Sequence, residues 1–169
     1  MTHLRGKTAL ITGGAAGIGR TIALGLARDP SYGHVVIVDR DIERARGVAD
    51  EIAREAKHDR PPDSGRAHSF ECDVANGASV QVMVARIHAE IGPVDVLVNN
   101  AGIASPPGLP FDNNTDEDWD RTFDVNVKSV FRMCKALAPQ FRERRTGSIV
   151  NIASTAALIA APIQPPYSV

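Results

Sequence analysis

A glycine-rich segment near the N-terminus, Thr12–Gly19, constrains the fold of this 169-residue chain more than any other feature. It follows the apolar run Thr8–Ile11 and opens a segment with Ile22, Ala23 and Leu26 at helical spacing. This order predicts a buried strand, a tight turn and a helix. Glycine permits the tight turn and lets phosphate oxygens approach the backbone where a Cβ would block them. Because the helix start offers free N–H groups and the positive end of its dipole, the segment predicts a diphosphate-binding turn.

The same alternation of apolar runs and helix-like segments continues along the chain. Unbroken runs of Val, Ile and Leu are typical of strands buried on both faces of a parallel sheet. Short links between strands and helices predict right-handed crossovers, so residues 1–169 are expected to form one α/β domain, a doubly wound parallel sheet of the Rossmann type. The expected strands are Thr8–Thr12, His34–Asp39, Ala67–Val74, Val94–Asn99 and Ser148–Ile152. The expected helices are Gly17–Arg28, Asp41 to about Lys57, Asn76–Ile91 and Thr115 to about Arg142.

Loops, caps and one long helix complete this outline. Residues 59–66 form a loop, and the proline-rich residues 104–114 are expected beside the ligand site. Asp41, Asn76 and Thr115 have side chains suited to cap the helices that follow them. The long helix is expected to bury one apolar stripe, made of Trp119, Phe123, Val127, Val130, Phe131, Cys134 and Leu137.

The composition excludes several other classes of function. The formal net charge is −1, from 19 basic and 20 acidic side chains, which gives no charge excess for nucleic acid or an anionic membrane. No apolar run approaches the roughly 20 residues that span a bilayer, and no signal peptide is expected. Cys72 and Cys134 lie far apart and the histidines are scattered, so no metal site is expected. Two free thiols fit a reducing compartment, and the expected location is cytoplasmic.

Asp39 closes the second expected strand, 20 residues after Gly19. A carboxylate at this place accepts hydrogen bonds from both hydroxyls of an adenosine ribose and repels a 2′-phosphate, which favours NAD over NADP. Ala16, in place of a basic residue, agrees with this preference. Arg40 acts against it, since it can neutralise Asp39 or reach a phosphate. The alternative interpretation is that Asp39 caps the following helix.

Two further strand ends carry polar or small residues. Asp73–Val74 ends the third expected strand, where a carboxylate can accept a hydrogen bond from an adenine amino group; the alternative is a turn-forming aspartate. Asn99–Gly102 ends the fourth, where small residues leave space for a ligand and the amides can tie neighbouring strands together. The alternative here is a plain turn.

Three polar residues in the second half of the chain are candidates for chemistry. Asn126 lies on the expected buried side of the long helix, where an asparagine has poor helix propensity; the alternative is an asparagine satisfied by local backbone. Ser154 follows the fifth strand, and Tyr167 lies 13 residues later. Each of these hydroxyls is unremarkable by itself.

Together these residues resemble the short-chain dehydrogenase/reductase family, in the expected order and over essentially the whole chain. The resemblance implies hydride transfer between a nicotinamide and a small carbonyl or secondary-alcohol substrate, with NAD as cofactor and NADP less favoured. It implies no metal, and it implies the catalytic residues Asn126, Ser154 and Tyr167. The cofactor-binding residues that it implies are Gly13, Ala15, Gly17, Ile18, Gly19, Asp39, Asp73, Val74, Asn100, Ala101 and Gly102.

The resemblance also implies a Tyr-x-x-x-Lys motif that begins at Tyr167, whereas the chain ends at Val169. We therefore expect a form truncated before the lysine and before the C-terminal strands. A tyrosine with its ordinary pKa of about 10 is almost entirely protonated at neutral pH, and a nearby ammonium favours the phenolate. Without that ammonium, weak or no activity is expected.

Truncation has two further expected consequences. The fifth strand should present an open edge, because its expected neighbour is missing. Outward apolar residues of the long helix should be exposed or contact another subunit, because the partner helix that the resemblance implies is missing. The resemblance also implies a homo-oligomeric parent enzyme. A non-catalytic dinucleotide-binding module is the alternative function.

Overall fold

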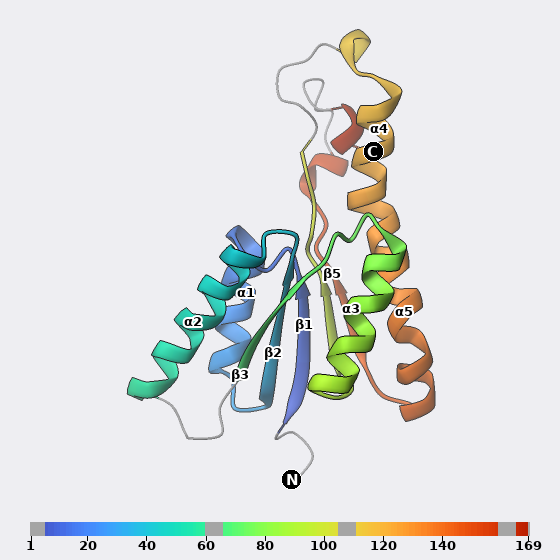
Figure 1. The fold of residues 1–169 in the computed structure, drawn as a ribbon. Helices are drawn as coiled ribbons and strands as arrows, with labels where there is room; N and C mark the ends of the chain where they lie inside the picture. Colours follow the sequence, from blue (N-terminus) through green and yellow to red (C-terminus); the bar gives the residue numbers. More distant parts are fainter. Residues whose placement is uncertain (1–5, 60–65, 105–110, 159–164, 169) are drawn as a thin grey trace.

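The computed structural model describes residues 6–59, 66–104, 111–158 and 165–168. Its centre is a five-stranded parallel sheet in the order β3-β2-β1-β4-β5 (Figure 1). The strands are β1 (Lys7–Thr12), β2 (Tyr32–Asp39), β3 (Arg66–Glu71), β4 (Val96–Asn99) and β5 (Ser148–Asn151). The α-helices are α1 (Gly17–Arg28), α2 (Ile42–Asp59), α3 (Gly77–Glu90), α4 (Asp116–Phe123) and α5 (Ser129–Arg144). A π-helical turn, η2 (Asp124–Lys128), joins α4 to α5, and the 3-10 turns are η1 (Phe111–Asn113), η3 (Thr155–Ala157) and η4 (Pro165–Tyr167).

The strand order confirms the doubly wound sheet expected from the sequence. From β1 the chain moves outward through β2 to β3, and then returns to the other side of β1 with β4 and β5. The direction of winding therefore reverses between β1 and β4, where such sheets bind ligands at the carboxyl ends of the strands. Helices α1 and α2 cover one face, α3 and α5 cover the other, and α4 rises beyond the carboxyl ends (Figure 1).

Alternate residues of the central strands contribute to two separate cores. Ala9 and Ile11 of β1 face α1 and α2, whereas Leu10 between them faces α3 and α5. All three are fully buried. Burying one large aliphatic side chain stabilises the fold by roughly 1.5–3 kcal/mol, so packing on both faces holds the carboxyl edge of the sheet in place.

The three helix caps expected from the sequence are present. Asp41 Oδ1 accepts a hydrogen bond at 3.1 Å from the amide three residues later. Asn76 Oδ1 accepts from the second and third following amides at 2.9 and 3.1 Å. Thr115 and Asp118 form a reciprocal capping box at the start of α4.

Three strands are shorter than expected, and one of them is β5, which ends at Asn151 rather than at Ile152. β3 ends at Glu71 rather than Val74, because the Asp73 carboxylate accepts a hydrogen bond from the Ala75 amide at 2.9 Å and turns the chain. β4 likewise begins at Val96, two residues later than expected.

The long helix differs from expectation in its buried face. The π turn adds a wider turn between α4 and α5, which shifts the two helices out of the phase that a period of 3.6 residues assumes. Leu137 is fully buried as expected, whereas Val127 and Phe131 are 49% and 63% exposed, so the prediction was wrong for these two. The remaining stripe residues, Trp119, Phe123, Val130 and Cys134, are half-buried.

β5 lies at one edge of the sheet, and all four of its residues are exposed. Ile149 and Val150 are 43% and 45% exposed, which agrees with the open edge expected for the fifth strand. Among the described segments, no helix has the length and apolar character needed to cross a membrane.

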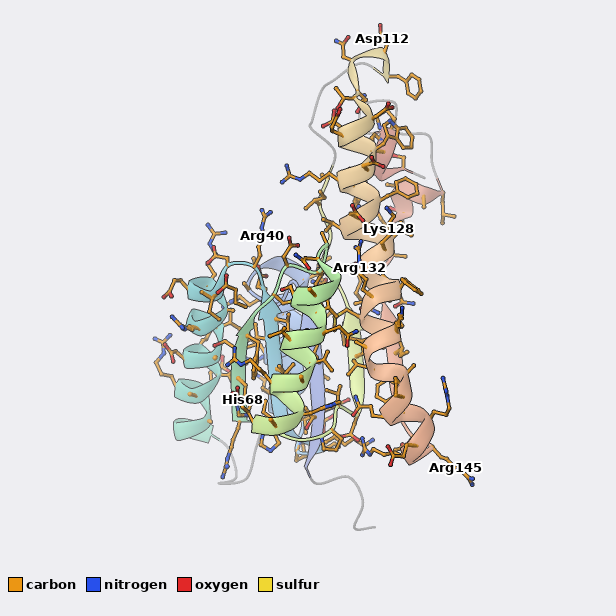
Figure 2. All side chains as sticks on the ribbon, turned by 45° about the vertical axis from the view of Figure 1, so that its right-hand side comes forward. Arg40, His68, Asp112, Lys128, Arg132 and Arg145 are labelled. Carbon is orange, nitrogen blue, oxygen red and sulfur yellow. The ribbon has the colours of Figure 1, made fainter. Side chains whose placement is uncertain are left out.

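Two histidines meet across β2 and β3, away from the carboxyl edge (Figure 2 labels His68). His34 Nδ1 and His68 Nε2 lie 3.0 Å apart, so one of these nitrogens must be unprotonated to accept the hydrogen bond. Burial lowers the pKa of both rings, and the neighbouring His34 lowers the pKa of His68 further.

We expect the free energy of unfolding to fall as the pH drops below about 6.5, because the unfolded chain then binds protons that the folded pair resists. Urea unfolding between about pH 7.5 and 5.5 should show this loss, and the double variant His34→Gln/His68→Gln should reduce it. The exposed His88→Gln is the control. If the free energy of unfolding of the double variant keeps the wild-type pH dependence, the loss of stability does not come from the His34–His68 pair.

Candidate functional site

The glycine-rich segment forms a tight turn between β1 and α1. Gly13 and Gly17 have φ angles of +63° and +51°, a left-handed conformation that side-chain-bearing residues rarely adopt. An added Cβ at Gly13 would also lie 2.8 Å from Ala101 Cα at the end of β4. Backbone geometry therefore requires glycine at position 13 for two independent reasons.

The first turn of α1 is suited to an anion. Its N-cap residue, Ala16, makes no side-chain cap hydrogen bond, and the first turn holds no acidic residue. The leading amides of a helix have no acceptor within it, and the helix dipole makes this end positive. The turn can therefore offer several N–H donors to a diphosphate.

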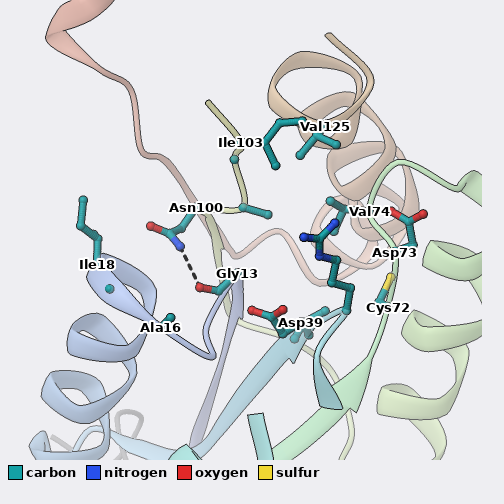
Figure 3. Close-up of a pocket in the computed structure, with 15 residues that line it drawn as sticks. Gly13, Ala16, Ile18, Asp39, Cys72, Asp73, Val74, Asn100, Ile103 and Val125 are labelled. Carbon is teal, nitrogen blue, oxygen red and sulfur yellow. Dashed lines mark hydrogen bonds between the residues drawn. The ribbon is translucent and has the colours of Figure 1, made fainter. Parts of the chain in front are cut away.

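Thr12 and Asn100 join this turn to β4. Thr12 Oγ1 accepts hydrogen bonds from the amides of Asn100 and Ala101, each at 3.1 Å. Asn100 Nδ2 donates to the carbonyls of Thr12 and Gly13 at 3.0 and 3.1 Å (Figure 3). Asn99 Nδ2 donates to a side-chain oxygen of β5 at 2.9 Å. These bonds confirm that the amides at the end of the fourth strand tie neighbouring strands together.

Asp39 ends β2 with its carboxylate held by two backbone amides. Oδ2 accepts from the Ala15 amide and Oδ1 from the Asp41 amide, each at 3.1 Å. A carboxylate has about four acceptor sites, so each oxygen keeps capacity for another donor. Asp41, rather than Asp39, accepts the hydrogen bond that caps α2. Asp39 is thereby left as an oriented acceptor at the edge of a cleft (Figure 3).

The larger of two adjoining clefts has a volume of about 520 Å³ and lies at the carboxyl ends of the central strands. Asp73 and Val74 lie on the side opposite Ile18 (Figure 3). Asp73 makes the turn described above and still lines the cleft, so the two interpretations of this residue are compatible. The predicted cofactor residues that line the cleft are Gly13, Gly17, Ile18, Asp39, Asp73, Val74, Asn100, Ala101 and Gly102.

Ala15 and Gly19, also predicted as cofactor residues, do not line this cleft. Ala15 is buried, and its amide holds Asp39. An added Cβ at Gly19 would lie 2.2 Å from the Gly13 carbonyl oxygen and 2.5 Å from Asn100 Nδ2. The structure therefore gives both residues a supporting position behind the turn.

The second cleft, of about 450 Å³, holds the three predicted catalytic residues, Asn126, Ser154 and Tyr167. It shares Ile18 and residues 100–103 with the larger cleft, so the two adjoin. Apolar side chains contribute to its lining, among them Phe123, Val127, Ile152 and Pro166. Most of the loop 104–114 expected here lies outside the described residues.

Asn126 exchanges two hydrogen bonds with the backbone of Ile103. Its Oδ1 accepts from the Ile103 amide at 2.8 Å, and its Nδ2 donates to the Ile103 carbonyl at 2.9 Å. The alternative of an asparagine satisfied by local backbone is therefore wrong, because Ile103 is 23 positions away in the chain. The side chain ties the π turn to the segment that both clefts share.

The two candidate hydroxyls lie on short turns. Ser154 caps η3, where its Oγ accepts from the Ala156 amide at 3.1 Å. This bond uses Ser154 as an acceptor and leaves its proton able to donate. Tyr167 ends η4. The described residues contain no group of three or more His, Cys, Asp or Glu side chains that could bind a metal ion.

Comparison with known proteins identifies the family. The family model described as short chain dehydrogenase matches residues 7–169. The chain belongs to this family. The 2,3-dihydro-2,3-dihydroxybenzoate dehydrogenase of Bacillus subtilis (strain 168) is 38% identical over 154 residues, which cover 91% of this chain and 54% of that protein. The D-threitol dehydrogenase of Mycolicibacterium smegmatis (strain ATCC 700084 / mc(2)155) is 38% identical over 158 residues, which cover 94% of this chain and 56% of that protein.

This short-chain dehydrogenase thus spans about half the length of the curated relatives that it matches. Among solved structures, a metagenomic short-chain oxidoreductase in complex with NADP has a TM-score of 0.86 and 31% identity, covering 99% of this chain and 71% of that one. A 7α-hydroxysteroid dehydrogenase complexed with NADH and 7-oxo glycochenodeoxycholic acid has a TM-score of 0.84 and 32% identity, covering 98% and 61%.

Several residues of this short-chain dehydrogenase's site have a role that was not predicted from the sequence. Thr12 organises the turn, while Ile103 and Val125 line the larger cleft. A hydroxyl at the end of a buried strand was an available signal for Thr12, because a buried Thr needs a partner. Ile103 and Val125 carry no such signal, since ordinary apolar residues occur throughout the chain.

We expect Gly19→Ala to destabilise this short-chain dehydrogenase by about 2–4 kcal/mol, since the new methyl group must displace backbone atoms of the turn. Chemical denaturation measures the change. Gly25→Ala in the same helix is the matched control: its Cβ meets nothing within 4 Å, and helix propensity predicts a gain of up to about 1 kcal/mol. Equal effects of the two variants would contradict the close packing of Gly19.

Proposed function

We propose that this short-chain dehydrogenase is an oxidoreductase that binds NAD in preference to NADP. Asp39 carries the proposal, because its carboxylate lines the larger cleft and is oriented by two backbone amides. The adjacent hydroxyls of an adenosine ribose suit this acceptor, whereas a 2′-phosphate would place a second negative charge beside it. Structural neighbours include complexes with NADP and with NADH, so the preference rests on this chain's own residues.

Arg40 lines the same cleft and favours the opposite choice, because a guanidinium attracts phosphate. Arg40 is exposed, so solvent and salt screen its charge. Asp39 is half-buried and fixed by backbone donors. We therefore expect Asp39 to determine the choice of NAD over NADP, and we expect Arg40 to reduce the ratio of the two affinities.

The residues of the larger cleft fit a dinucleotide. The open first turn of α1 and the glycine turn would hold its diphosphate, and Asp39 would hold its ribose. When bound, the nicotinamide supplies or accepts a hydride. In the adjoining cleft, the Ser154 hydroxyl would donate a hydrogen bond to the substrate oxygen, and the Tyr167 hydroxyl would give or take the proton.

The substrate class that we propose is a small secondary alcohol or the corresponding carbonyl compound. The names of the two curated relatives suggest a polyol and a cyclic diol as first candidates. We further propose a cytoplasmic location and a homo-oligomeric parent enzyme, in keeping with the free thiols and with the exposed Val127 and Phe131.

We expect calorimetry to give a lower Kd for NAD than for NADP. Asp39→Asn should weaken NAD binding about tenfold and narrow the preference, because a hydrogen bond to a charged group contributes roughly 1.5–3 kcal/mol. Arg40→Gln should increase the preference for NAD over NADP, because it should weaken the binding of NADP.

The control is Asp41→Asn, which removes the same charge two residues later, at a carboxylate that caps α2 and that we do not place in the cleft. It should leave the ratio of the two Kd values within about twofold, since an exposed charge is screened. Equal affinity of the wild-type chain for NAD and NADP would overturn the role of Asp39.

Tyr167→Phe should abolish any reduction of NAD in the presence of D-threitol, followed as absorbance at about 340 nm, because the hydroxyl that moves the proton is lost. The Kd for NAD should stay within about twofold. Tyr32→Phe, at the amino end of β2, is the control. Turnover by Tyr167→Phe equal to that of the parent would remove Tyr167 from the mechanism. NAD binding by the wild type without turnover on any alcohol would favour a dinucleotide-binding module.

A further inference from the structure

The π turn η2 requires stabilising contacts from the residues around it. A π turn is rare within an α-helix, and such turns are frequent at functional sites, where surrounding contacts stabilise them. Asn126 lies in the middle of this turn and makes the two hydrogen bonds to Ile103. Whatever fixes the turn therefore also fixes the direction of the Asn126 side chain.

Arg132 spans this turn by binding both the side chain and the backbone of Asp124. Its Nη2 donates to Asp124 Oδ1 at 2.7 Å, and its Nη1 donates to the Asp124 carbonyl oxygen at 2.9 Å. In an uninterrupted α-helix, side chains three or four residues apart meet, and residues eight apart are separated by about 12 Å along the axis. Arg132 nevertheless reaches Asp124 across the π turn, and it donates a hydrogen bond to the carbonyl at the start of that turn.

Arg132 and Lys128 contribute unequally to this contact. The Arg132 side chain is 21% exposed, whereas Lys128 is 53% exposed and its Nζ lies 3.3 Å from the same carboxylate oxygen. The hydrogen bond from Arg132, and after it the one from Lys128, lower the pKa of Asp124 below its ordinary value. Figure 2 shows both cations on the long helix. A partly buried, two-pronged contact is the stronger of the two, because exposed ion pairs contribute little.

We propose that Arg132, acting through Asp124, is a positioning residue that holds the π turn and thereby directs the Asn126 amide at Ile103. The segment that it positions, residues 100–103, lines both clefts. The positioning role of Arg132 rests only on its hydrogen bonds to Asp124 and on those between Asn126 and Ile103. Its consequence for cofactor affinity rests on the proposed function.

The test is hydrogen exchange of the Ile103 amide, which donates to Asn126 Oδ1, measured by NMR on this chain. Arg132→Met should speed this exchange about tenfold, because it removes both contacts across the turn. Asp124→Asn, which keeps the backbone carbonyl and a neutral acceptor, should give a smaller increase. Lys128→Met is the matched control, since it takes one positive charge from the same carboxylate without touching the backbone. Its exchange rate should stay within about twofold of the wild type.

The amides of Leu10 and Val36, in the buried central strands, are internal references. If they accelerate as much as Ile103, or if Lys128→Met acts as strongly as Arg132→Met, the proposal is overturned, because the effect is then global or a matter of charge alone. If Arg132→Met fails to fold, Asp124→Asn gives the decision: unchanged Ile103 exchange overturns the proposal, and selective acceleration supports it.

Calorimetry with NAD separates this proposal from the proposed function. Arg132→Met should raise the Kd for NAD several-fold, since the shared wall is loosened. Selective acceleration of Ile103 exchange with an unchanged Kd would leave Arg132 as the positioning residue and would contradict a role of this wall in cofactor binding. A wild-type chain that does not bind NAD would overturn the proposed function and leave the exchange result standing.

Discussion

The contact between the glycine turn and the end of β4 is the constraint on which the rest of the structure depends. Asn100 donates to the Gly13 carbonyl oxygen, and Gly19 lies against that same oxygen with no room for a side chain. Thr12 completes the contact by accepting two amides from the end of β4. Because β1 and β4 flank the reversal of winding, these few bonds set the position of α1 relative to the larger cleft and fix the start of the wall that both clefts share.

The candidate residues of the second cleft are positioned by contacts to backbone atoms, and not by direct contacts between their side chains. Asn126 binds the backbone of Ile103, and Ser154 follows β5, which pairs with β4 in parallel register. Asn126 and Ser154 therefore come from separate elements that are both positioned relative to the end of β4. Packing on both faces of the sheet holds that strand, so the stability of the fold and the geometry of the site have the same source.

The sequence predicted the features that depend on neighbouring residues. It did not predict the features that depend on contacts between segments far apart in the chain. The apolar runs, the caps at Asp41, Asn76 and Thr115, and the sheet class all follow from spacing within a few residues. Val127 and Phe131 are exposed because a π turn interrupts the helix. The contact that holds this turn joins residues eight positions apart, and a pattern of apolar residues with a period of 3.6 does not predict such a contact. The supporting position of Gly19 depends on a carbonyl and an amide from two other segments, which spacing along the chain does not reveal.

Register explains why one acidic residue can be assigned to the cleft from sequence distance. In the β1–β2 pair, Thr12 lies opposite Val38, and the Gly14 amide donates to the Val38 carbonyl at 3.2 Å. Asp39 is therefore the first residue of β2 beyond the pairing, beside the turn. The alternation of Val36 and Ile37 between the two cores fixes this register, because a slip of one residue would exchange every buried side chain of β2 between faces. Such a slip would also bring Arg40 to the place of Asp39 and reverse the charge that meets a ribose. The buried packing of β2 thus determines the electrostatic character of the cleft at its end.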